Sequence, residues 1–159
     1  MFEPEIKHIE AENVAFIEMR GPYSQIPESY GRLYGWVEAR GFKPAPDKMP
    51  AAVYLTMPEE TSEENALWEL WAPLHGGPPD LPVDEVGIGI KRVEATRVVS
   101  LMHKGPYDTV GPSYEKVVAF IANEGLAVSG PPMELYYSDP NNTAPEDYLT
   151  EIRFPIGDA

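Results

Sequence analysis

The chain has 159 residues, a formal net charge of −14, 43% hydrophobic residues and no cysteine. This length and apolar fraction suit one domain with its own core and exclude a disordered chain. The acidic balance argues against a reader of duplex DNA, and the lack of cysteine excludes disulfides, thiolate zinc sites and cysteine nucleophiles.

The amino terminus has no basic stretch followed by an apolar run, and no window approaches the roughly 18 apolar residues of a membrane span. We therefore expect a cytoplasmic protein with neither a membrane nor a direct nucleic-acid partner.

An internal repeat organises the chain. Gly21-Pro22-Tyr23 recurs as Gly105-Pro106-Tyr107, 84 residues later. Matches continue in unbroken order, with Glu69 meeting Glu151 at an offset of 82, until Pro73 meets Pro155. Self-similarity at a fixed spacing indicates two copies of one structural unit.

The repeat predicts a single α+β domain over residues 1–159. Repeat one covers about 3–74, a Gly- and Pro-rich linker covers 75–85, and repeat two covers about 86–156. Neither copy alone covers its own apolar faces, so we expect the two to share one pseudo-twofold core.

Each copy is predicted to form a strand, a helix and two further strands. The expected strands of the first copy are Val14–Arg20, Ala51–Met57 and Ala66–Ala72, and those of the second are Arg97–Lys104, Met133–Ser138 and Tyr148–Phe154. Glu5–Ile9 and Val86–Val93 are expected to be additional strands that enter the first and the second copy, respectively.

Apolar residues at helical spacing follow each Gly-Pro-Tyr turn. The two stripes are Ile26, Tyr30, Leu33, Tyr34 and Val37, and Val110, Tyr114, Val117, Val118 and Ile121. Pro27 and Pro112 suit a first helical turn, and Gly41 and Gly125 suit the left-handed position just after a helix.

Glu69 and Glu151 each lie inside an apolar strand. Because side chains alternate along a strand, Glu69 shares a face with Trp71, and Glu151 shares a face with Arg153. A carboxylate walled by aromatic rings favours a lipophilic cation. Two other interpretations remain open: both glutamates lie on a solvent face, or Glu151 pairs with Arg153.

Aromatic residues recur in pairs, as Tyr23 with Tyr107 and Tyr54 with Tyr136. Paired positions suggest either a symmetric structural role or the wall of a pocket. His8, His75 and His103 are scattered without metal-ligand spacing, so we expect no metal and no cofactor.

The order of Gly105-Pro106-Tyr107, Glu134-Leu135-Tyr136-Tyr137-Ser138-Asp139-Pro140 and Thr150-Glu151-Ile152-Arg153-Phe154-Pro155 resembles the GyrI-like small-molecule-binding family. This family includes the effector-binding domain of BmrR- and Rob-type regulators. The resemblance covers nearly the whole chain and implies a stand-alone form of that domain.

The resemblance implies two strand-helix-strand-strand modules that form a curved, barrel-like antiparallel sheet, with two outer helices and a ligand groove between the modules. It also implies that Glu151 is the buried acid that contacts cationic aromatic ligands. Arg153 departs from the family, whose members usually place an apolar or aromatic residue there. A guanidinium at this position would weaken cation binding or shift the preference toward an anionic or neutral ligand.

The leading hypothesis is a binding protein for lipophilic, aromatic small molecules, cations among them, used for drug or effector sensing or for sequestration. Its expected ligand-binding residues are Glu151, Glu69, Trp71, Tyr107, Tyr136, Tyr54, Tyr23 and Arg153. The first alternative is a hydrolase of cyclopropane-containing or related xenobiotics with Glu151 as catalytic residue. The second is a protein-interaction module similar to gyrase-inhibitor relatives.

Overall fold

The computed structural model describes residues 2–56, 60–78, 80–138 and 142–157, and the chain divides into two compact units. Unit 1 contains residues 1–10 and 95–159, and unit 2 contains residues 11–94. Both combine antiparallel strands with one long helix, which confirms the α+β class. The groove that the family resemblance implies between the modules stays a prediction.

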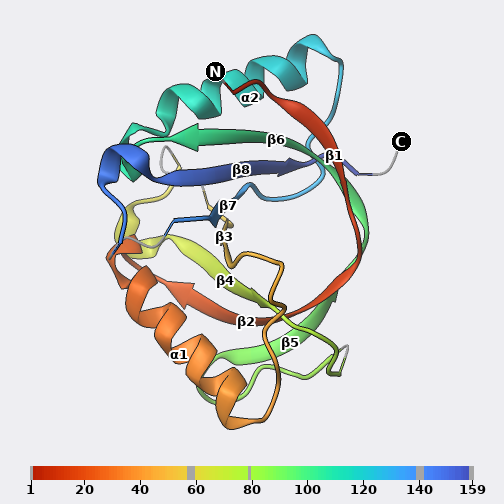
Figure 1. The fold of residues 1–159 in the computed structure, drawn as a ribbon, viewed down its shortest axis with the longest axis vertical. Helices are drawn as coiled ribbons and strands as arrows, with labels where there is room; N and C mark the ends of the chain where they lie inside the picture. The colour runs from red at the N-terminus through yellow and green to blue at the C-terminus, as the bar shows by residue number, and fades with distance from the viewer. Residues whose placement is uncertain (1, 57–59, 79, 139–141, 158–159) are drawn as a thin grey trace. The chain divides into compact units, whose positions relative to one another are not determined.

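Unit 1 contains four antiparallel strands in the spatial order β1-β6-β8-β7. Its elements are β1 (Glu5–Ile9), β6 (Thr96–Lys104), α2 (Gly111–Asn123), β7 (Met133–Tyr136) and β8 (Leu149–Pro155). Helix α2 lies beside β6 in Figure 1.

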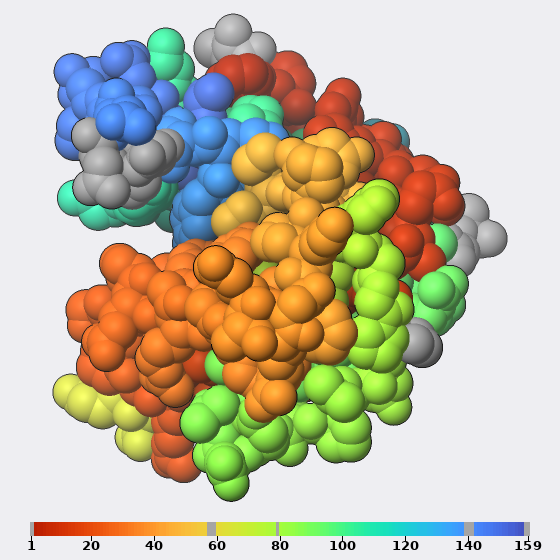
Figure 2. Space-filling view, turned by 60° about the horizontal axis from the view of Figure 1, so that its bottom comes forward, coloured from red at the N-terminus to blue at the C-terminus, as the bar shows by residue number. Residues whose placement is uncertain are grey.

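Unit 2 repeats this order as β5-β2-β4-β3. Its elements are β2 (Glu12–Arg20), α1 (Ile26–Ala39), β3 (Ala51–Tyr54), β4 (Leu67–Pro73) and β5 (Ile88–Val93). Figure 2 shows α1, drawn in orange, on the outer surface of this unit. The expected strand Ala51–Met57 ends at Tyr54, and Met57 lies outside the described residues. The same holds for Asp139 and Pro140 of the family motif.

The first strand of each repeat belongs to the unit built from the other repeat. β1 pairs with β6, and β5 pairs with β2, so the expectation that Glu5–Ile9 enters the first copy and Val86–Val93 the second is wrong. Two-residue hairpins of type I′ require positive φ at both loop positions. Glu10-Ala11 connects β1 to β2, and Glu94-Ala95 connects β5 to β6. Because no described non-glycine residue has positive φ, neither connection folds its two strands into such a hairpin.

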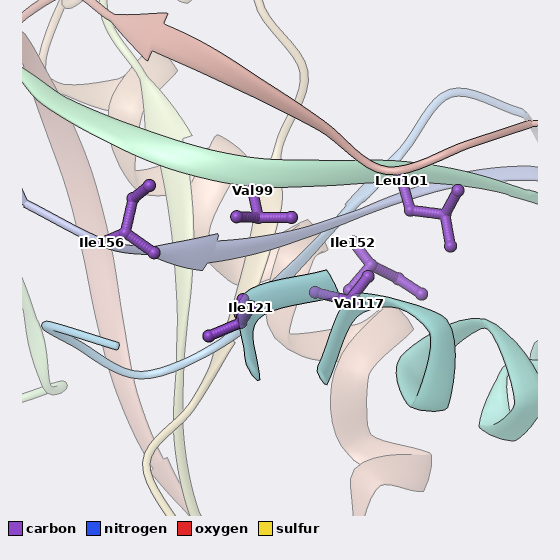
Figure 3. Close-up of a cluster of buried hydrophobic side chains, with 6 residues drawn as sticks. All are labelled: Val99, Leu101, Val117, Ile121, Ile152 and Ile156. Carbon is purple, nitrogen blue, oxygen red and sulfur yellow. The ribbon is translucent and has the colours of Figure 1, made fainter. Parts of the chain in front are cut away.

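The core of unit 1 lies between α2 and one face of its sheet. Val99, Leu101 and Ile152 from the strands meet Val117 and Ile121 from the helix, as Figure 3 shows. Removing side chains of this kind from water contributes about 1.5–3 kcal/mol each. The face of β8 that carries Ile152 therefore packs against α2, and Glu151 and Arg153 point to the opposite face of the sheet.

The helix ends follow the sequence signals. Prolines stand in the first turns of both helices, and Gly41 and Gly125 have φ values of 76° and 67°, as the expected left-handed positions require. Val118 is different, because it is 54% exposed and does not belong to the apolar stripe. The stripe of α2 is therefore narrower than its sequence suggests.

Candidate functional site

The carboxylate of Glu151 is completely buried, with 0% of the residue exposed. Ser100 Oγ donates to Oε2 at 2.7 Å, and Tyr137 Oη donates to Oε1 at 2.5 Å. Arg153 donates from Nε to Oε2 at 2.7 Å and from Nη2 to Oε1 at 3.2 Å. A carboxylate has about four acceptor positions, so these contacts engage both oxygens fully.

The surroundings of Glu151 determine its protonation state. Burial raises its pKa, but the hydrogen bonds and charge of Arg153 and the hydrogen bonds from Tyr137 and Ser100 outweigh burial and lower the pKa to about 2. Burial and the adjacent carboxylate raise the pKa of Tyr137 to about 12. At neutral pH Glu151 is therefore ionised, and Tyr137 retains its proton as a donor.

Two cations accompany this one buried carboxylate. Besides Arg153, Lys7 of β1 places Nζ 3.6 Å from Oε2 of Glu151. Lys7 also approaches the exposed Glu5 at 3.7 Å. Of the alternatives that the sequence left open, pairing of Glu151 with Arg153 is the one that the structure contains, and the negative charge at position 151 is compensated within unit 1.

Glu69 occupies the matching strand position in unit 2 and is also paired. Lys91 Nζ lies 2.6 Å from Oε1, and Trp71 Nε1 donates to the same oxygen at 2.8 Å. The Lys91 ammonium also lies over the rings of Phe16 and Trp71, at 4.5 Å and 5.0 Å from their centroids. Trp71 therefore lines the face of Glu69, as the alternation predicts.

Tyr107 and Tyr136 lie away from Glu151. Tyr136 stands opposite Thr150, and successive residues of β8 alternate faces, so Tyr136 shares the helix face of the sheet. Its ring meets Tyr107 edge-on at 5.4 Å, and Tyr107 stacks on Tyr148 at 4.8 Å. These tyrosines form a cluster of their own on the α2 side.

Glu134 is a buried acid that the sequence analysis did not single out. It accepts hydrogen bonds from Tyr114 of α2 at 2.6 Å and from Tyr136 at 3.2 Å. Burial raises its pKa more than these bonds and the proximity of His103 lower it. Its sequence signal was its place as the first residue of the family motif that begins Glu134-Leu135-Tyr136.

Tyr23 and Tyr54 form the equivalent cluster in unit 2. Their rings meet edge-on at 5.4 Å, and Tyr23 lies 6.1 Å from Trp68. Trp68 is fully buried and precedes Glu69 directly in β4, so the two side chains point to opposite faces. Neither Tyr23 nor Tyr54 therefore shares the face of Glu69.

Besides Arg153 and Trp71, which the sequence analysis placed beside the two acids, it missed four residues that contact them: Tyr137, Ser100, Lys7 and Lys91. Tyr137 stood in the quoted family motif, but its place on the face of Glu151 follows only from the register that puts Leu135 opposite Glu151. Ser100, Lys7 and Lys91 come from other strands, so only the strand register identifies them.

In the part of the chain that the structure describes, no group of three or more His, Asp or Glu side chains is arranged to hold a metal ion. The helices of this part are also too short or too polar to cross a membrane.

The family model of the GyrI-like small molecule binding domain matches residues 2–157. The chain therefore belongs to this family of small-molecule-binding domains, as the sequence resemblance predicts. A search of curated proteins finds no match.

Four solved structures illustrate the shared fold. The C-terminal domain of EcmrR has a TM-score of 0.84 and 20% identity, covering 100% of this chain and 99% of that domain. In a cryo-EM structure of an EcmrR–DNA complex, the chain spans 58% of the EcmrR chain, with 99% of this chain covered.

The other two are a hydrolase from Listeria innocua and SAV2435 bound to tetraphenylphosphonium. The hydrolase has a TM-score of 0.69 and 18% identity, with 96% of this chain and 91% of the hydrolase covered. SAV2435 has a TM-score of 0.61 and 14% identity, with 97% and 93% covered. At these identities the likeness establishes the fold alone.

Proposed function

We propose that the chain binds lipophilic, aromatic small molecules that are neutral or anionic, at the face of unit 1 that carries Glu151 and Arg153. The observation that carries this proposal is the pairing of Glu151, whose oxygens accept from Arg153, Tyr137 and Ser100. A ligand cation gains little from a carboxylate that a guanidinium already neutralises.

Arg153 is the group that would meet the polar end of such a ligand. A guanidinium has five N–H donors, and Glu151 accepts from Nε and from Nη2. The side chains of Arg153 and Lys7 are 15% and 37% exposed, whereas that of Glu151 is fully buried. Cationic donors, rather than the acid, are therefore the groups that solvent and a ligand reach.

The same geometry disfavours Glu151 as the general base of a hydrolase. A general base works best with a pKa near the working pH, and the pKa of Glu151 is about 2. Binding is therefore better supported than hydrolysis by this residue.

Three probes of similar shape and different charge test the proposal: tetraphenylphosphonium, triphenylphosphine oxide and tetraphenylborate. Thermal unfolding is measured at physiological ionic strength, where the Debye length is about 8 Å. The salt then screens the repulsion between the anionic probe and the protein's net charge of −14. We expect the neutral or the anionic probe to raise Tm, by about 5–10 °C at one hundred times its Kd, and the cation to leave it unchanged.

The variant Glu151→Gln separates the two ligand classes. It frees Arg153, so anion binding is expected to persist or strengthen, whereas direct pairing of Glu151 with a ligand cation would be lost. Glu146→Gln is the matched control, because it makes the same charge change at an exposed position of unit 1. Selective stabilisation of the wild type by tetraphenylphosphonium, abolished by Glu151→Gln alone, would contradict the proposal.

A further inference from the structure

Glu69 and Glu151 occupy equivalent strand positions in the two units, but different side chains surround them. In unit 2, Phe16 stands opposite Trp71 on β2 and β4, and Lys91 comes from β5. In unit 1 the equivalent pair on β6 and β8 is Ser100 opposite Arg153. Unit 2 therefore surrounds its acid with aromatic rings, where unit 1 has polar side chains.

Glu69, Trp71 and Phe16 form what we call the unit 2 cage. Alternation places all three on one face of the sheet, and Lys91 lies opposite Val14 on the same face as Phe16. A carboxylate with two ring faces is the chemistry that binds an ammonium ion, through charge pairing and cation–π attraction. The cage therefore has the composition of a site for an amine.

Lys91 already occupies this cage. Its ammonium is 2.6 Å from Glu69 Oε1, 4.5 Å from the Phe16 centroid and 5.0 Å from the Trp71 centroid. These are the contacts that the ammonium of a ligand would make. Glu69 is only 9% exposed, so the lysine also compensates a carboxylate that water reaches poorly.

We propose that Lys91 is an internal occupant that closes an ammonium site in unit 2 and thereby excludes ligand cations from it. Truncation of this side chain opens a site for a primary alkylammonium. The proposal concerns residues of unit 2 only, and its test does not depend on the ligand proposed for unit 1.

Chemical rescue of Lys91→Ala tests this directly. The removed atoms correspond to n-propylammonium, which is the probe. We expect Lys91→Ala to lower Tm, and n-propylammonium to restore it in a saturable way, by about 3–6 °C at ten times its Kd. The indole N–H resonance of Trp71, assigned with Trp71→Phe, should shift over the same concentration range.

Three controls define the result. The wild type should not respond to n-propylammonium, 1-propanol should not rescue Lys91→Ala, and the double variant Lys91→Ala/Glu69→Gln should not be rescued by the amine. An equal response of the wild type, or rescue that persists without the Glu69 carboxylate, would overturn the proposal. If Lys91→Ala does not fold, Lys91→Val, which suits a strand and still removes the outer part of the side chain, is measured in its place with ethylammonium as the probe. A folded variant that binds no amine would equally refute the proposal.

Discussion

Replacing Arg153 with methionine is expected to reduce the free energy of unfolding by about 3–5 kcal/mol at pH 7, the usual cost of removing one partner from a buried ion pair. Methionine preserves much of the apolar stem of arginine. The loss therefore arises because the fully buried Glu151 carboxylate loses two of its four hydrogen bonds and the nearer of its two cations.

Urea unfolding of the wild type and three variants measures this effect. The double variant Arg153→Met/Glu151→Gln should recover much of the lost stability, because it buries no charge. Arg92→Met is the matched control: Arg92 and Glu94 form an exposed pair, 2.8 Å apart, and such pairs contribute only about 0–1 kcal/mol. A loss in Arg153→Met no larger than in Arg92→Met would show that the buried pair does not stabilise unit 1.

The second large effect is the acid sensitivity that Glu151 confers. Its pKa in the folded chain is lowered to about 2, from the ordinary glutamate value of about 4.3. A group with a lowered folded pKa stabilises the protein above its unfolded pKa, and this stability is lost as the pH falls toward the folded value. The shift corresponds to about 3 kcal/mol at neutral pH, of which roughly half should be lost by about pH 3.

Comparison with Glu151→Gln isolates this contribution from those of the other acids. The difference in the free energy of unfolding between wild type and variant should be constant above about pH 6 and should shrink steadily below about pH 5. Glu134, whose pKa burial raises, changes stability in the opposite sense but is present in both proteins and cancels. A difference that is independent of pH would contradict the assigned ionisation.

The repeat and its hydrophobic spacing were sufficient to predict the main elements. Strand β6 and the first residue of β7 were predicted to within one residue, because local alternation and turn residues specify them. The strands with which β1 and β5 pair were not predictable, since strand pairing depends on contacts between segments far apart in the sequence.

The candidate site was predictable only in part. Alternation along one strand was enough to place Arg153 beside Glu151 and Trp71 beside Glu69. The positions of Tyr107 and Tyr136 relative to Glu151 required the register of β7 on β8, which puts Tyr136 opposite Thr150. Similarly, the partners Ser100 and Lys7 come from β6 and β1, and no pattern within β8 indicates them.

The most direct test of the buried pair is an NMR titration of the Glu151 side-chain carboxyl carbon, assigned by its absence in Glu151→Gln. We expect the carboxyl carbon to keep the chemical shift of an ionised group as the pH falls well below 4.5 and to titrate with a midpoint of about 2. A midpoint at or above the ordinary glutamate value of about 4.3 would mean that Arg153 does not neutralise Glu151, and that the acid is available to a ligand cation after all.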